Sequence, residues 1–134
     1  MDIYRVETDS NGLSEVSKLD EVNSRWHEST SALSPDGKTL YFPVGKHGSS
    51  RIYIIDLDRN NMQTITPEIG AVGLFGIDRA GQKLAYFLSD IADPGQIWVQ
   101  DLMPGEHPKV LTAVNAWLQD IDLGTVDEVW FEGR

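Results

Sequence analysis

The stretch from Ser34 to Asp58 decides the fold, and it reads SPDGKTLYFPVGKHGSSRIYIIDLD. In its opening turn, proline presets the first corner, aspartate bonds its own backbone, and glycine takes the position with positive φ. Two apolar runs follow, residues 40–42 and 51–57, separated by a polar loop. Both are rich in β-branched and aromatic residues and too short for helices. The stretch therefore predicts a tight turn followed by a pair of strands.

This pattern returns along the chain with a period of about 45 residues. Strand-like segments start at Ile3, Ile52 and Ile97, at spacings of 49 and 45 residues. Further landmarks are the apolar residues Leu19, Ile65 and Leu111, spaced 46 and 46 residues apart, and the matching segments 39–42, 83–86 and 128–131. Because separate landmarks agree on one period, the sequence predicts a repeated structural unit.

A unit of four short strands in roughly 40–50 residues is typical of a β-propeller blade. We therefore expect an all-β fold, a β-propeller fragment of about three four-stranded blades with incomplete blades at both ends. The partial propeller domain, residues 1–134, divides into a half blade at 1–20, full blades at 29–67 and 71–113, and a half blade at 116–132. No segment sustains helical periodicity.

Propellers usually have at least four blades. The sequence therefore predicts part of a longer polypeptide, with open sheet edges that must be covered. A homo-oligomer formed through these edges is one way to cover them.

Within the blades, the inner strands Leu40–Val44 and Leu84–Leu88 are apolar at consecutive positions. That pattern predicts strands covered on both faces, as when blades stack on each other. We expect Tyr53, Trp98 and Trp130 to fill the gaps between blades, where aromatic side chains bury large areas.

Composition limits the partners. The net charge is −10, from 21 acidic and 11 basic residues, which argues against nucleic acid or an anionic membrane surface. With no cysteine, a disulfide, a thiolate metal site and a cysteine nucleophile are excluded. No apolar run approaches the roughly 18 residues of a membrane span, and the first residues lack the features of a signal peptide. We expect a cytoplasmic protein.

No catalytic, cofactor-binding or metal-binding residue is assigned, and no cofactor is expected. A serine hydrolase needs its nucleophile on a strained elbow, typically G-x-S-x-G, whereas Gly45–Ser50 lacks that pattern and is interpreted as a polar loop. The histidines His27, His47 and His107 stand singly, without the paired spacing of metal ligands.

Two acidic segments imitate calcium ligands. Residues 56–61 resemble the opening of an EF-hand loop, but Asn61 and Pro67 stand where glycine and glutamate are needed. Asp120 and Asp122 also lack the ligand set of a calcium-binding loop, because Gly124 occupies the position of the next ligand. Both segments are interpreted as turns. Residues 26–28 (Trp-His-Glu) lead into the innermost strand of a blade, so a contact role near the channel stays open beside the favoured reading, a connecting loop.

The turn Ser34–Lys38 and the strand after it resemble the propeller repeats of TolB-like proteins and of prolyl-oligopeptidase-type peptidases. In the next blade the motif has become Asp78-Arg79-Ala80-Gly81. The end of the chain, Leu111-Thr112, Asn115, Leu118, Leu123 and 127–133, resembles the last propeller repeat of acylaminoacyl-peptidase-like members of that peptidase family.

This resemblance implies a parent serine peptidase whose propeller gates peptide access to an α/β-hydrolase domain. That domain, with its whole Ser-Asp-His triad, is expected after residue 134. The implied partners are the hydrolase domain and peptide substrates, and this chain alone would not be an enzyme. Two alternatives remain: a TolB-like propeller that serves as a protein-binding scaffold, and a propeller-based polysaccharide lyase, which would need metal-binding histidines in the channel.

Overall fold

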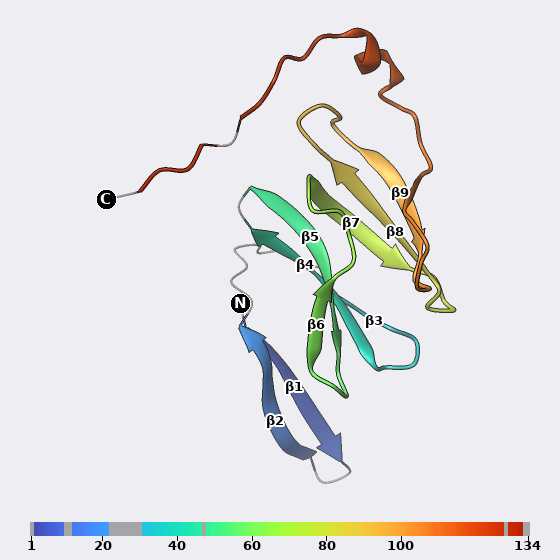
Figure 1. Cartoon of the computed structure of the whole chain (residues 1–134). Coiled ribbons are helices and arrows are strands. Elements are labelled where there is room, and N and C mark those ends of the chain that lie inside the picture. The colour runs from blue at the N-terminus through green and yellow to red at the C-terminus, as the bar shows by residue number, and fades with distance from the viewer. Residues whose placement is uncertain (1, 10–11, 22–30, 47, 128, 133–134) are drawn as a thin grey trace.

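The structure is a computed structural model that describes residues 2–9, 12–21, 31–46, 48–127 and 129–132. Nearly all of its regular structure is β (Figure 1). The strands are β1 (Asp2–Asp9), β2 (Gly12–Glu21), β3 (Ala32–Leu33), β4 (Thr39–Lys46), β5 (Ser49–Asp56), β6 (Asn61–Thr64), β7 (Ala71–Ile77), β8 (Lys83–Ser89), β9 (Gln96–Asp101) and β10 (Lys109–Val110). A 3₁₀ helix, η1, spans Ala116–Asp120.

Strands β3–β6 and β7–β10 form two antiparallel meanders of four strands each, with every strand paired to the next in sequence. They lie in residues 29–67 and 71–113, and we call them the first and second blade. One parallel pair, Ser50 of β5 with Ala71 of β7, joins them into an eight-stranded sheet. The backbone N–H of Ser50 also donates to the Gly70 carbonyl at 3.1 Å.

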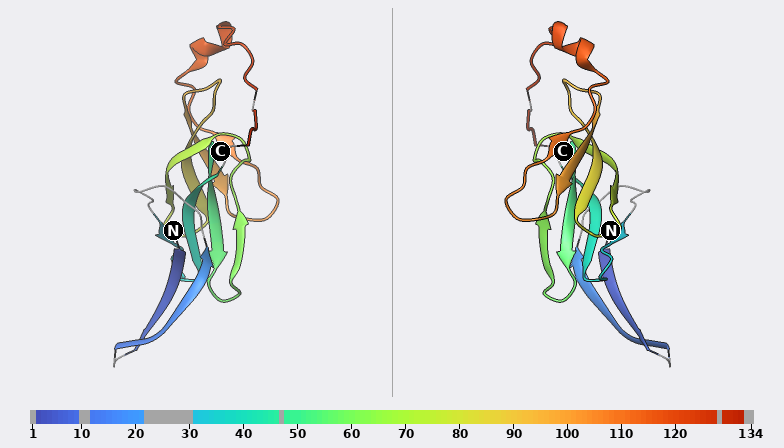
Figure 2. Two further views of the ribbon diagram at one scale, coloured as in Figure 1. Left: turned by 90° about the vertical axis from the view of Figure 1, so that its left-hand side faces the viewer. Right: turned by 90° about the vertical axis from the view of Figure 1, so that its right-hand side faces the viewer.

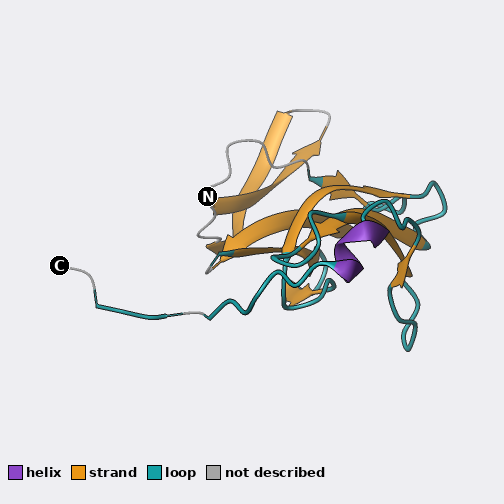
Figure 3. Cartoon of the chain, turned by 90° about the horizontal axis from the view of Figure 1, so that it is seen from above, coloured by secondary structure: helices purple, strands orange, loops and turns teal. Residues whose placement is uncertain are grey.

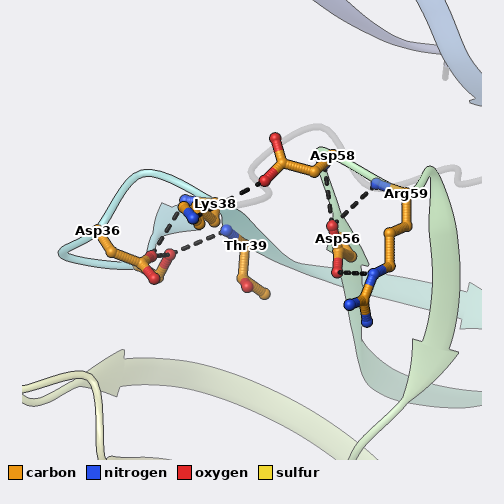
Figure 4. Close-up of polar contacts among 7 residues, drawn as sticks. Asp36, Lys38, Thr39, Asp56, Asp58 and Arg59 are labelled. Atoms are coloured by element: carbon orange, nitrogen blue, oxygen red, sulfur yellow. Dashed lines mark hydrogen bonds and ion pairs between the residues drawn. The ribbon is translucent and has the colours of Figure 1, made fainter.

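The turn at Ser34–Gly37 forms as the sequence predicts. The Gly37 N–H donates to the Ser34 carbonyl at 2.9 Å, and Gly37 has a φ of 73°. The Asp36 carboxylate accepts the Lys38 N–H at 3.1 Å, while the Ser34 hydroxyl accepts the Thr39 N–H at 2.9 Å (Figure 4). Two side chains therefore close this turn and start β4.

The core of the chain lies between the two blades. Five buried side chains form one cluster there: Tyr41, Ile52, Val72, Leu84 and Tyr86. A second cluster on the other face of the first blade holds Phe42, Val44 and Ile55. Strand β4 is thus covered on both faces, as its consecutive apolar residues predict.

Strand β8 differs from that prediction. Leu84 and Tyr86 are buried, but Ala85 between them is exposed, so the strand alternates instead of being covered on both sides. The physical reason is the neighbour: the first blade covers one face of β8, and among the described residues no further blade packs on the other.

Strands β1 and β2 form a separate two-stranded sheet, paired from Asp2–Glu21 to Asp9–Gly12. The hairpin projects from one end of the larger sheet in two views (Figures 1 and 2). The sequence places residues 1–20 as the last two strands of a blade, and in the structure this segment is a hairpin.

The described residues of segment 116–132 contain η1 and no strand. The two strands expected in this segment are therefore not present among its described residues, and Trp130, which the sequence predicts to fill a gap between blades, is 67% exposed. The reason is that strands need neighbours to pair with, whereas this segment runs away from both sheets (Figures 1 and 3).

Candidate functional site

The residues weighed for chemistry do not gather in the structure. Gly45 is the last residue but one of β4, and Ser50 is the second residue of β5. His107 is exposed in the loop before β10. His27, His47 and the segment 26–28 lie outside the described residues. Among the residues that are described, no group of three or more His, Asp or Glu is placed to hold a metal ion.

The acidic segment at 56–61 is a turn, as its sequence predicts. The Asp56 carboxylate accepts the N–H groups of Asp58 and Arg59 at 2.9 and 3.0 Å (Figure 4). The Arg59 side chain approaches the same carboxylate at 4.0 Å. Asn60 has a φ of 51°, a left-handed conformation that asparagine tolerates. Asp56 therefore caps the connection from β5 to β6.

A surface of a different kind lies at the end of the second blade where β8 passes into β9. Four large apolar side chains are exposed there: Ile69 (80%), Ile91 (73%), Val114 (68%) and Trp117 (60%). We call them the apolar end. Ile69 lies in the link from β6 to β7, Ile91 in the loop from β8 to β9, and Val114 and Trp117 in the segment before η1 and in η1 itself. These segments share one end of the blade in Figure 1.

A polar network fixes two of these connections to each other. The Asn115 amide donates to the Asp93 carboxylate at 2.8 Å and to the Gly95 carbonyl at 2.9 Å. The Gln96 amide donates to Asp93 at 2.9 Å, and its carbonyl accepts the Thr112 hydroxyl at 2.6 Å. The loop from β8 to β9 and the segment before η1 are therefore held in one arrangement.

The loop also depends on Gly95, which has a φ of 140°. The ring of Phe87 occupies the space that a Cβ at this position would need. Only glycine fits such close approach at positive φ. The contact between Gly95 and Phe87 therefore fixes the conformation of this loop in addition to the hydrogen bonds of the network.

Asp93 acts in this network as a structural carboxylate, which accepts hydrogen bonds in its ionised form. Hydrogen bonds from the Gln96 side chain, then from the Gly95 backbone and the Asn115 side chain, hold the pKa of Asp93 below its usual value. Asp93 is therefore ionised at neutral pH and accepts hydrogen bonds. The arrangement presents apolar side chains on a fixed support, which suits binding to a surface.

Sequence reasoning missed the apolar end. The Asp93-Pro94-Gly95 turn was a local signal for an ordered loop, but its partner Asn115 lies 22 residues away from Asp93. No local pattern links the two.

No helix among the described residues is long and apolar enough to cross a bilayer.

The stacked four-stranded blades define the chain as part of a β-propeller. Among solved structures it is similar to TolB from Acinetobacter baumannii, with a TM-score of 0.61 and 19% identity over 73% of this chain and 24% of that chain. It is also similar to a putative TolB from Agrobacterium tumefaciens, with a TM-score of 0.55 and 15% identity over 81% of this chain and 44% of the other.

These likenesses confirm the all-β propeller prediction and the TolB-like part of the resemblance. They give no support to the peptidase part. The chain spans about a quarter of one TolB chain and less than half of the other. No family model matches the sequence, and no curated protein matches it.

Proposed function

We propose that this chain is a propeller segment that binds another protein through the apolar end and catalyses no reaction itself. The observation that carries the proposal is the exposure of Ile69, Ile91, Val114 and Trp117 at one end of the second blade, where a polar network fixes the loop that carries Ile91 to the segment that carries Val114. Several large apolar side chains exposed on neighbouring segments are typical of a protein interaction site.

The charge around the apolar end defines the partner more closely. Glu68 precedes Ile69 and is 84% exposed at its side chain. Asp90 precedes Ile91 and is exposed as well. With a net charge of −10 for the whole chain, electrostatic complementarity favours a partner that presents apolar side chains flanked by lysine or arginine.

A phage-displayed random peptide library provides a defined probe. We expect selection on this chain to enrich peptides that combine Leu, Ile or aromatic residues with Lys or Arg. Ile91→Asp and Val114→Asp should weaken the binding of an enriched peptide more than tenfold, because each inserts a carboxylate into the contact. Gln63→Asp is the matched control, since Gln63 is exposed on β6 away from the apolar end.

Raised salt should weaken the same binding, because it screens attraction between opposite charges. Enriched peptides that bind Ile91→Asp as well as they bind the original chain would refute the proposal. A selection that enriches no peptide would refute it too.

A second candidate function is the gating of peptide access to an α/β-hydrolase domain. It is supported by the resemblance of residues 111–133 to the last propeller repeat of acylaminoacyl-peptidase-like proteins. The coding sequence that follows Arg134 tests it. A strand leading to G-x-S-x-G would support a serine peptidase, whereas further propeller repeats or a stop codon would refute one. The cytoplasmic location and the absence of nucleic acid and membrane partners stay predictions.

A further inference from the structure

Exposed apolar side chains do not stop at the apolar end but continue along the segment that leaves it. We call residues 117–127 the arm. Besides Trp117, which belongs to the apolar end, the arm exposes Ile121 (46%), Leu123 (48%) and Val126 (59%). The arm runs away from both sheets (Figures 1 and 3). The apolar end therefore has an extension that projects beyond the second blade.

The arm is fixed to the second blade at its start. The polar network anchors the side chain of Asn115, just before the arm begins. The next hydrogen bonds are local, because the Leu118 N–H donates to the Asn115 carbonyl at 3.0 Å and the Ile121 N–H donates to the Leu118 carbonyl at 3.1 Å. The arm therefore has a fixed origin, and its apolar side chains are open to a partner.

Acidic and apolar residues alternate in the middle of the arm, in the order Asp120, Ile121, Asp122, Leu123. Ile121 has extended backbone, with a φ of −112° and a ψ of 126°. In a strand, successive side chains point to opposite sides. When residues 120–123 are extended throughout, one side of this stretch is apolar and the other is acidic.

The stretch ends at a turn. The Asp122 carboxylate accepts the Gly124 N–H at 3.0 Å, and Gly124 has a φ of 75°. Glycine adopts such a left-handed conformation without strain. Residues 120–123 are therefore the part of the arm that can serve as a short strand.

The arm carries no positive charge to balance its carboxylates. Residues 110–133 contain no lysine, arginine or histidine. Asp120, Asp122 and Asp127 are exposed, and the ion pairs among the described residues lie elsewhere in the chain. Opposite charges across an interface favour a partner that supplies the missing cations.

These features define one kind of partner. The apolar side of the stretch requires apolar side chains opposite it, and the acidic side requires lysine or arginine. An extended segment in which the two kinds alternate offers both, and pairing of two extended segments adds hydrogen bonds between their backbones. We propose that residues 120–123 bind an extended segment of a partner protein in which apolar residues alternate with lysine or arginine.

This inference rests on the proposed function, because Trp117 belongs to both the apolar end and the arm. It goes further in one respect. The apolar end requires apolar side chains with basic residues nearby, whereas the arm requires that the two alternate along a strand.

A synthetic peptide of four leucine–lysine repeats with blocked ends is the probe. The control peptide has the same composition, with all leucines before all lysines. We expect the full chain to bind the alternating peptide about tenfold more tightly, because only the alternating order matches both sides of the stretch. Fluorescence anisotropy of the labelled peptides measures both affinities.

Substitutions in the arm test its two sides separately. Leu123→Ser should weaken binding of the alternating peptide about fivefold, because it removes an apolar contact. Asp120→Asn should weaken it about threefold at low salt and reduce its salt dependence, because it removes one attraction between opposite charges. Both side chains are exposed, so these variants should fold, which circular dichroism checks. Met103→Ser and Glu106→Gln are the matched controls, because both side chains are exposed in the loop between β9 and β10.

Three outcomes would overturn the proposal. The first is that the alternating peptide does not bind, or binds no better than the control peptide. The second is that Leu123→Ser or Asp120→Asn leaves its affinity unchanged. The third is that the chain self-associates without peptide and becomes monomeric in Leu123→Ser, which would assign the arm to a contact between copies.

Failure of this proposal can be distinguished from failure of the proposed function. Leu123→Ser leaves the four residues of the apolar end unchanged, and Ile91→Asp leaves the arm unchanged. Library peptides that lose binding to Ile91→Asp, together with no preference for the alternating peptide, would retain the apolar end and remove the arm. Library peptides that bind Ile91→Asp normally, together with an alternating peptide that requires Leu123, would do the reverse.

Discussion

The two full blades have the same strand order, yet they differ in how much apolar surface they bury. Strand β4 in the first blade is covered on both faces, while β8 in the second blade is covered on one. Their apolar runs are similar in the sequence. The comparison teaches that the repeat fixes the backbone and the direction of each side chain, whereas burial depends on whether a neighbouring blade is present.

The backbone contacts show how closely the blades agree. The Thr66 hydroxyl accepts the Ile52 N–H at 2.9 Å, and the Thr112 hydroxyl accepts the Ile97 N–H at 2.9 Å. The Lys38 carbonyl accepts the Leu57 N–H at 2.8 Å, and the Gln82 carbonyl accepts the Leu102 N–H at the same distance. The same bonds recur although only one of the two isoleucines is buried.

We expect the largest difference in stability between the two blades from substitutions at this pair of isoleucines. Ile52→Ala should lower the free energy of unfolding by about 2–5 kcal/mol, because it removes buried methyl groups and leaves a cavity in the core between the blades. Ile97→Ala should cost about 1 kcal/mol or less, since that side chain is 40% exposed. Urea denaturation followed by circular dichroism measures both. Equal losses would contradict the view that the neighbouring blade sets burial.

Much of the fold could be predicted from local signals. The Ser34–Gly37 turn, the strand at 52–55 and the period of the repeat are encoded in residues close together in the sequence. The diverged turn at Asp78–Gly81 was recognisable from its glycine alone, which has a φ of 68° in the structure. The structure therefore confirms what short-range chemistry determines.

Long-range contacts could not be predicted in the same way. The exposure of Phe131, although its counterpart Tyr86 is buried, depends on which neighbours are present. The link between Asp93 and Asn115 depends on two loops meeting in space. A single sequence shows which kinds of contact such residues can make, but it does not show which residues they contact.

The next largest effect that we expect is a difference in stability between variants of the turn Ser34–Gly37 and variants of the turn Asp78–Gly81. In the second blade the Asp78 carboxylate alone accepts the N–H groups of Gln82 and Lys83, at 2.7 and 2.9 Å. In the first blade Asp36 and Ser34 share this task. Asp78→Ala should therefore lower the melting temperature by roughly 5 °C, and Asp36→Ala by about half as much. Differential scanning calorimetry at pH 7 provides the measurement.

These turns also predict a response to acid. Hydrogen bonds, for Asp78 mainly from the Lys83 backbone and for Asp36 mainly from the Ser34 hydroxyl, lower the pKa of each carboxyl from 3.8. A lowered folded-state pKa stabilises the fold above the unfolded-state pKa, and this is lost as the pH falls through the folded value. The difference in melting temperature between the original chain and Asp78→Ala should therefore shrink below about pH 4. A difference that stays constant down to pH 2 would rule out the ionised carboxylate as the cause.

The smallest effect concerns Tyr86, whose counterpart in the first blade is Phe42. The Tyr86 hydroxyl is buried and has no hydrogen-bond partner among the described residues. Burial raises its pKa from 10.0 to about 12. Tyr86→Phe should leave the melting temperature unchanged or raise it by about 2–3 °C at pH 7, because it removes a buried polar group that makes no bond.

The same hydroxyl predicts a response to alkaline pH. A group whose pKa is raised in the folded state stabilises the fold below its unfolded-state pKa, and this stabilisation is lost as the pH rises through the folded-state pKa. The original chain should therefore lose stability between about pH 10 and 12, and Tyr86→Phe should lose less of it. Thermal melts at pH 7 and pH 11 test both statements, with Tyr53→Phe as the control because Tyr53 is only partly buried. A clear loss of stability in Tyr86→Phe at pH 7 would show that the hydroxyl makes a bond that stabilises the core between the blades.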